Sequence, residues 1–173
     1  MCEVKHKINK NKVVFLDRDG VINKKIPNDY VKSWEEFVFL PDVQEAIKLL
    51  NQAQFKVIVV TNQAGIAKGI VKEEQLHQIH QQMINEIKNY GAHIDAVYYC
   101  PHRIEDNCEC RKPKHGMLEK ADKEIKIDFK NSWMIGDEHK DIEAGKRAGC
   151  KTCQVTPNRG LLQIVKEIIT KPQ

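Results

Sequence analysis

The chain alternates short, continuous apolar runs with segments in which apolar residues recur every three or four positions. The short runs are typical of strands buried on both faces of a parallel sheet, and the periodic segments are typical of helices that pack one face against it. We predict five strands, over residues 12–16, 57–60, 96–99, 133–135 and 151–155. We predict five helices, over residues 42–54, 73–90, 117–126, 141–148 and 161–170.

Two of these helices carry further signals. Asp42 stands at the start of the first helix, where a short polar side chain commonly accepts a hydrogen bond from an unpaired backbone amide, so we expect it to cap that helix. The second helix stops at Gly91, and its apolar stripe consists of Leu76, Ile79, His80, Met83, Ile84 and Ile87. We expect surface or core positions, without a chemical role, for His77, His80, His93, His115 and His139.

The alternation of strand and helix predicts an α/β fold, a single three-layer domain over residues 1–173 with a parallel sheet and right-handed crossovers. In such a sheet the ligand site lies outside the carboxyl ends of the strands. Polar groups follow three predicted strands, and they are Asp17-Arg-Asp19, Thr61-Asn-Gln63 and Gly136-Asp137. Lys112 comes after the loop that follows a fourth strand. We expect all four groups to share one crevice.

Composition narrows the class of protein. With 173 residues, 41% apolar and 30% charged, the chain has the balance of a soluble globular domain. No apolar run approaches the length of a membrane span, and the first residues lack a signal pattern, so we expect a cytoplasmic protein without a membrane segment. The basic stretch from Lys5 to Lys12 is short and lacks aromatic residues, so we interpret it as a solvated leader and expect no nucleic-acid partner. We expect a monomer.

Paired carboxylates provide the first indication of chemistry. Asp17 and Asp19 are two residues apart at the end of an extended segment, so their side chains can share one side. Such carboxylates repel each other unless a cation lies beside them, and Mg²⁺ prefers hard oxygen ligands and accepts a substrate phosphate. Asp137 would supply a third carboxylate from another strand end. The sequence therefore predicts a magnesium site made by Asp17, Asp19 and Asp137.

With magnesium bound, these residues can be assigned to the hydrolysis of a phosphate ester. Asp17 would attack phosphorus as the nucleophile and form an acyl phosphate. Asp19 would protonate the leaving alcohol and then take a proton from the attacking water, while its backbone carbonyl reaches the metal. Thr61 would hold the phosphoryl oxygens, and Lys112 would offset the developing negative charge.

The loop over residues 100–110 carries a second set of candidate ligands. Cys100, His102, Cys108 and Cys110 supply three thiolates and one imidazole, a suitable tetrahedral set for Zn²⁺. The set leaves no open position, so a structural zinc that holds Arg111 and Lys112 over the crevice is favoured over a catalytic one. Cys150 and Cys153 lie next to or within a predicted strand, and we interpret them as packed thiols and not as a redox pair.

Four motifs resemble, in order, those of the haloacid dehalogenase superfamily of phosphatases. They are Asp17-Arg-Asp-Gly-Val21, Thr61-Asn62, Lys112 and Gly136-Asp-Glu-His-Lys-Asp141. The resemblance implies a Rossmann-like sheet, an aspartyl-phosphate mechanism with Mg²⁺, and a role for Asp141 in supporting Lys112 or a metal-bound water. No insertion large enough for a cap domain follows Asp19 or Thr61. A nearly capless enzyme is therefore implied.

A narrower resemblance comes from Tyr99-Cys-Pro-His102 together with Cys108-Glu-Cys-Arg-Lys-Pro113. This signature is similar to that of two groups, the heptose-1,7-bisphosphate 7-phosphatases and the histidinol-phosphatase domains. Residues 61–69 and 112–118 favour the first group. The implied reaction is hydrolysis of the 7-phosphate of D-glycero-D-manno-heptose 1,7-bisphosphate, a small phosphorylated sugar, in the synthesis of nucleotide-activated heptose and lipopolysaccharide core precursors.

The same resemblance implies a substrate pocket lined by Asn62, Gln63 and the loop of residues 25–30. Arg111 can make a bidentate contact to the second phosphate of such a substrate. Glu138 stands where a lysine can occur in the family, which would reverse the sign of one substrate contact. Two alternatives stay open: hydrolysis of histidinol phosphate, and a zinc-stabilised binding module without catalysis.

Overall fold

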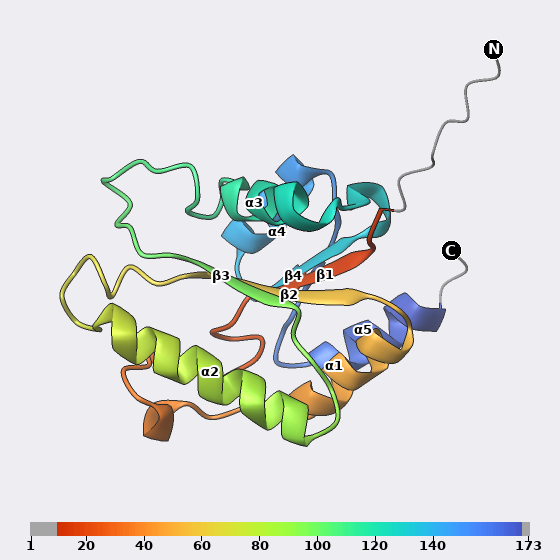
Figure 1. The fold of residues 1–173 in the computed structure, drawn as a ribbon, viewed down its shortest axis with the longest axis horizontal. Coiled ribbons are helices and arrows are strands. Elements are labelled where there is room, and N and C mark those ends of the chain that lie inside the picture. Colours follow the sequence, from red (N-terminus) through yellow and green to blue (C-terminus); the bar gives the residue numbers. More distant parts are fainter. Residues whose placement is uncertain (1–9, 171–173) are drawn as a thin grey trace, which may run out of the picture.

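The computed structural model describes residues 10–170, in which five strands form one sheet of the order β3-β2-β1-β4-β5 (Figure 1). Every neighbouring pair is parallel. The strands are β1 (Val13–Leu16), β2 (Lys56–Asn62), β3 (Ala96–Cys100), β4 (Trp133–Gly136) and β5 (Lys151–Gln154). The chain builds outward from β1 to β3 and then crosses to β4 on the other side of β1. The strand order thus reverses beside β1, which places the ligand crevice of such folds at the carboxyl ends of β1 and β4.

Helices cover both faces of the sheet (Figure 1). One face carries α1 (Val43–Gln52), α2 (Glu73–Asn89) and α5 (Leu161–Thr170), and α1 packs directly against α5. The other face carries α3 (Gly116–Ile125) and α4 (His139–Ala148). Two short 3₁₀ turns, Trp34–Glu36 and Phe129–Asn131, complete the described elements. These layers confirm the α/β, three-layer architecture expected from the sequence.

The central strand β1 shows why its run of apolar residues is continuous. Val14 and Leu16 belong to the core beneath α1, α2 and α5. Val13 and Phe15 belong to the core on the opposite face. All four side chains are fully buried, because successive residues of a strand point to opposite faces and both faces are covered by helices. β1 is therefore a rigid base for the polar residues that follow it.

All ten elements predicted from the sequence are present, with ends that differ by at most two residues. The prediction that the Asp42 side chain caps α1 is wrong. Asp42 has a φ of 61° and makes no side-chain capping bond, and only its backbone carbonyl takes part, by accepting from Ala46 N at 2.9 Å. A short polar residue tolerates this left-handed conformation, and the tight turn after Pro41 directs the chain into the helix without a side-chain cap.

The predicted basic leader, Lys5 to Lys12, lies mainly outside the described residues. Within residues 10–170, none of the helices combines the length and the apolar character needed to cross a bilayer.

Candidate active site

Four segments of the chain meet at the carboxyl ends of β1, β2 and β4. Asp17 follows β1, and its backbone amide continues the sheet by donating to the Ile135 carbonyl at 3.0 Å. Thr61 lies near the end of β2 on one side of β1, and Asp137 follows β4 on the other. Lys112 enters from the loop after β3. The structure thus brings together residues separated by more than 100 positions.

The Lys112 ammonium is fully enclosed at the centre of this cluster. Its Nζ lies 2.9 Å from Asp17 Oδ1 and 2.8 Å from Asp141 Oδ1, and it donates to the Val60 carbonyl at 2.8 Å. Burial alone would lower the pKa of Lys112, but the Asp17 and Asp141 carboxylates raise it above its ordinary value. Lys112 is therefore a fixed positive charge next to the predicted nucleophile.

The carboxylates around Lys112 form a group suited to a divalent cation. Oxygens of Asp17, Asp137 and Asp141 all lie within 4.8 Å of one another. Burial raises the pKa of Asp17 to about 6, and the neighbouring Asp141 and Asp19 raise it too, although the Lys112 charge opposes the shift. Asp137 Oδ1 is buried without a hydrogen-bond donor among the described residues, which is unfavourable for an ionised oxygen. A hard cation such as Mg²⁺ would satisfy this arrangement.

Two glycines let the backbone pass close to these carboxylates. A Cβ at Gly20 would lie 2.4 Å from Asp137 Oδ2, and Gly20 has a φ of +92°. A Cβ at Gly136 would lie 2.1 Å from Asp141 Cβ. Side chains at either position would displace a carboxylate of the cluster, so both sites require glycine.

The Asp19 carboxylate is held by three side chains. Oδ1 accepts from Asn23 Nδ2 at 2.9 Å, Oδ2 accepts from Gln63 Nε2 at 2.8 Å, and an Arg18 nitrogen contacts both oxygens at 3.0–3.1 Å. Burial would raise the pKa of Asp19, but the Arg18 charge and these hydrogen bonds lower it below the ordinary value. The side chain keeps about a fifth of its surface exposed, at 22%, and it faces the cavity described below.

The two side chains that follow Thr61 hold other residues of the site in place through hydrogen bonds. Gln63 is buried and donates to both Asp19 Oδ2 and Thr61 Oγ1, at 2.8 and 2.9 Å. Asn62 donates to the Lys112 carbonyl and accepts from the Lys112 amide, both at 3.1 Å. Both residues were predicted to line the substrate pocket. The structure places Asn62 in the lining of the cavity described below and Gln63 outside that lining, and both amide groups hold catalytic candidates in place.

A cavity of about 150 Å³ opens directly above Asp17, Asp19 and Thr61. Its walls carry three cations, which are Lys25, Arg111 and Lys140. Glu138 lies between two of them, because it pairs with Lys25 and lies 2.7 Å from Lys140. The acidic side chain at this position is thus balanced by lysines. Apart from Asp17 and Asp19, the cavity is lined by three cations and two carboxylates, Asp29 and Glu138, so its walls keep a small net positive charge. The predicted substrate loop contributes Lys25, Ile26, Asp29 and Tyr30.

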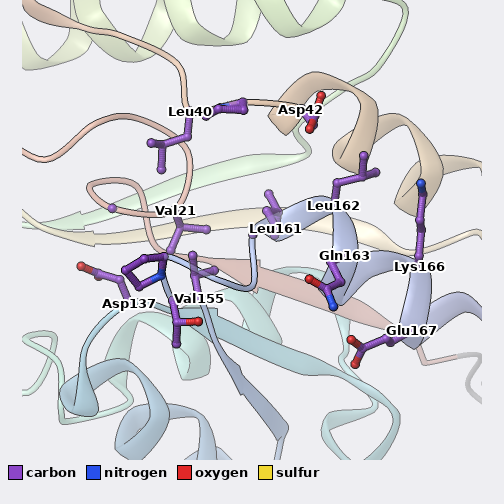
Figure 2. A pocket seen from close by; sticks show the side chains of 15 residues that line it. Val21, Leu40, Asp42, Asp137, Val155, Leu161, Leu162, Gln163, Lys166 and Glu167 are labelled. Carbon is purple, nitrogen blue, oxygen red and sulfur yellow. The ribbon is translucent and has the colours of Figure 1, made fainter.

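A larger cavity, of about 950 Å³, lies on the far side of Asp137 (Figure 2). It runs between the start of α1 and the start of α5, and its labelled lining includes Val21, Leu40, Val155 and Leu161. Apolar side chains dominate this lining, and Asp17, Asp19, Thr61 and Lys112 are not part of it. The smaller cavity is therefore the better candidate for phosphate chemistry, since Asp17, Asp19 and Thr61 line it.

The cysteine and histidine cluster has the geometry of a closed metal site. Cys100 Sγ lies 3.5 Å from Cys108 Sγ and 3.6 Å from His102 Nδ1. Cys110 Sγ lies 3.4 Å from Cys108 Sγ and 3.3 Å from His102 Nδ1. These separations are close to the edges of a tetrahedron around Zn²⁺, with bonds of about 2.0–2.3 Å. None of the five described cysteines forms a disulfide.

Hydrogen bonds connect the loop of this cluster to the segments that carry active-site residues. Arg111, the residue after Cys110, donates from Nη1 to the His102 carbonyl at 3.0 Å. Arg103 donates twice to the Ala67 carbonyl, in the loop that follows β2. The Cys100 carbonyl accepts from the Gln63 amide at 2.7 Å. A metal in this cluster would therefore hold the loops that carry Gln63 and Arg111.

Two residues near Asp19 were not expected to take part. Arg18 is completely buried, and one of its terminal nitrogens lies 3.1 Å from His80 Nε2. The sequence predicted His80 on the buried stripe of α2 but gave it no role. A polar side chain within an otherwise apolar stripe was the available signal, because a buried polar group requires a partner.

Comparison with known proteins agrees with the geometry. A family model described as HAD-hydrolase-like matches residues 109–164. The chain is 40% identical to the D-glycero-alpha-D-manno-heptose-1,7-bisphosphate 7-phosphatase of Photorhabdus laumondii, over 84% of this chain and 82% of that protein. It is 40% identical to the corresponding beta enzyme of Haemophilus ducreyi, over 82% and 80%. The crystal structure of the D,D-heptose 1,7-bisphosphate phosphatase of B. bronchiseptica, complexed with magnesium and phosphate, matches with a TM-score of 0.83 at 30% identity, over 91% and 98%.

Proposed function

We propose that this chain, which belongs to the heptose-1,7-bisphosphate 7-phosphatase family of HAD-like hydrolases, removes the 7-phosphate of D-glycero-D-manno-heptose 1,7-bisphosphate. The observation that carries the proposal is the small cavity, which has Asp17 and Asp19 at its floor and three cations on its walls. A cavity of this size can enclose the phosphate that is cleaved, and the cations on its walls suit the second phosphate of a sugar that extends out of it. The relatives are named for both anomers, so the proposal specifies the phosphate and not the anomer.

Hydrolysis proceeds in two steps. An Asp17 oxygen forms a bond to the phosphorus of the 7-phosphate while the bond from phosphorus to the sugar oxygen breaks, and Asp19 gives a proton to that oxygen. Asp19 then takes a proton from water as the water oxygen attacks phosphorus, and this releases Asp17 and inorganic phosphate. The three donors that hold Asp19 fix its carboxyl group where it lines the cavity. Because they also lower its pKa, Asp19 takes up a proton when the anionic phosphate binds beside it, and this proton goes to the sugar oxygen.

Thr61 and Lys112 stabilise the transferred group. Gln63 donates to Thr61 Oγ1, which leaves the hydroxyl hydrogen of Thr61 free to donate to a phosphoryl oxygen. Lys112, held by Asp17 and Asp141, supplies a positive charge that needs no rearrangement during the reaction. Asp141 is thus a support for Lys112.

Two metals fit the donor sets of the protein. Asp17, Asp137 and the backbone carbonyl of Asp19 would hold Mg²⁺, which when bound supplies positive charge to the phosphoryl oxygens. Cys100, His102, Cys108 and Cys110 would hold a structural Zn²⁺. The zinc would act on catalysis indirectly, through the loops that carry Arg111 and Gln63.

The proposed reaction is tested by following phosphate release with Mg²⁺ from heptose 1,7-bisphosphate and from histidinol phosphate. We expect heptose bisphosphate to be the better substrate by kcat/KM, and ³¹P NMR to identify the remaining phosphate as the one at position 1. Faster hydrolysis of histidinol phosphate, or loss of the 1-phosphate, would contradict the proposal.

Arg111 is predicted to bind the phosphate that is not cleaved. It lines the cavity wall, and a charge-assisted contact of this kind contributes about 1.5–3 kcal/mol. Arg111→Ala should therefore lower kcat/KM for heptose bisphosphate by about 10- to 100-fold and leave p-nitrophenyl phosphate nearly unchanged. Arg103→Ala is the matched control, since Arg103 belongs to the same loop but does not line the cavity. Equal losses on both substrates for Arg111→Ala would instead place Arg111 in the catalytic centre.

The zinc site leads to a stoichiometric prediction. Protein purified without chelator should contain about one zinc per chain, and Cys108→Ser should lose it and unfold at a lower temperature. Cys150→Ala is the control, because Cys150 is buried between α4 and β5 outside the cluster. Elemental analysis and thermal unfolding give the two measurements. A wild-type protein without zinc, or equal metal content in the Cys108 variant, would exclude the site.

A further inference from the structure

Arg18 and His80 form a buried polar pair, of which only Arg18 contacts a residue of the mechanism above. Arg18 has no exposed surface, and a buried guanidinium is unfavourable unless its donors are paired. Its Nη2 contacts the two carboxylate oxygens of Asp19 at 3.0 and 3.1 Å. Its Nη1 lies 3.1 Å from His80 Nε2. The guanidinium therefore links a helix residue to the predicted general acid.

The chemistry of arginine fixes the direction of the contact with His80. A guanidinium has donors only, so His80 Nε2 accepts the hydrogen bond and the ring proton lies on Nδ1. Burial and then the Arg18 charge lower the pKa of His80 to about 3, against an opposing effect of Asp19, so the ring is neutral at neutral pH. A neutral acceptor is what a buried guanidinium needs at this position.

The position of His80 is set by α2. This helix packs against the sheet through Leu76, Ile79, Met83 and Ile87, and His80 lies on the same buried face. The Tyr99 ring of β3 lies beside the imidazole, with centroids 5.9 Å apart. The imidazole is 62 residues from Arg18 in sequence and is held by a rigid element of the fold.

We propose that His80 is a positioning residue that holds the Arg18 guanidinium and, through it, orients the Asp19 carboxyl group toward the leaving oxygen. Without the acceptor on His80, Nη1 of Arg18 would be buried without this partner, and the guanidinium would turn away from Asp19. Asn23 and Gln63 would then hold Asp19 alone. This inference rests on the proposed function, in which Asp19 is the general acid.

The test uses two substrates that differ in their need for an acid. The sugar oxygen of heptose bisphosphate is a poor leaving group that requires protonation, whereas the p-nitrophenolate of p-nitrophenyl phosphate leaves without it. The value of kcat/KM covers the steps up to phosphoryl transfer to Asp17, so it isolates the step that needs the acid. A general structural defect would lower both values equally.

His80→Leu should lower kcat/KM for heptose bisphosphate by about 10-fold or more and for p-nitrophenyl phosphate by less than about 3-fold. His80→Gln should recover most of the loss, because its amide oxygen can accept from Arg18 near the position of Nε2. His77→Leu is the matched control, since His77 lies on the exposed side of the same helix and contacts Tyr99 and not Arg18. It should show no selectivity between the substrates.

Asp19→Asn tests the acid role of Asp19 separately from the link through His80. If Asp19→Asn shows the selective loss and His80→Leu does not, the link through His80 is wrong and the proposed function stands. If Asp19→Asn shows no selective loss, the acid role of Asp19 fails and the link fails with it. ¹⁵N NMR of the full-length enzyme gives a test that needs no variant. A His80 ring that is protonated on Nε2 at neutral pH would overturn the inference.

Discussion

Asp17→Asn is expected to lower kcat for heptose bisphosphate by about 10⁴-fold or more, because an amide does not attack phosphorus and the covalent step has no replacement nucleophile. The fold should persist. Asn has the size of Asp, and its oxygen can still accept from the Arg18 amide and from Lys112, which contact Asp17 at 2.7 and 2.9 Å. The variant therefore removes the nucleophile while leaving the fold in place.

Rapid quenching with ³²P-labelled substrate provides the measurement. Wild-type enzyme should show protein-bound label before phosphate appears, and Asp17→Asn should show none. Asp95→Asn is a suitable control, since Asp95 accepts from the Val57 amide at the opposite end of the sheet. Near-normal turnover by the Asp17 variant would exclude the aspartyl-phosphate mechanism.

The fold and most of the candidate site could be predicted because both depend on local patterns. A continuous apolar run followed by Asp17 predicts a buried strand with a carboxylate at its end, and Thr61 and Asp137 follow the same rule. Parallel strands place such ends side by side whatever the sequence between them. The Cys and His spacing likewise brought four metal-binding atoms into one short loop, and the structure places them within 4.8 Å of one another.

The parts that could not be predicted depend on contacts between distant segments. Arg18 stands between two aspartates, where an arginine is usually solvated, and only the packing of α2 over the loop shows that it is buried beside His80. Asn62 and Gln63 follow a motif residue and were therefore assigned to substrate. Their hydrogen bonds to Lys112 and Asp19 depend on loop positions that the sequence does not determine.

Lys112→Met is expected to have two separate effects, on catalysis and on stability. Loss of the charge beside the transferred phosphoryl group should lower kcat/KM by about 10²- to 10³-fold on both heptose bisphosphate and p-nitrophenyl phosphate. This equal loss distinguishes Lys112 from Arg111. The substitution also leaves the Asp17 and Asp141 carboxylates without their buried ammonium, which should reduce the free energy of unfolding by about 3–5 kcal/mol without added Mg²⁺.

Adding Asp141→Asn to Lys112→Met distinguishes these effects. The second substitution removes one of the unpaired charges, and the Asn oxygen can still accept from the Glu138 amide as Asp141 Oδ2 does at 3.0 Å. The double variant should therefore be more stable than Lys112→Met, with a coupling of about 1–3 kcal/mol in a double-mutant cycle, while its activity stays low. Lys146→Met, at an exposed position of α4, is the control and should change stability by less than about 0.5 kcal/mol. Additive changes in stability would mean that Asp141 does not support Lys112, and recovered activity in the double variant would remove Lys112 from the catalytic step.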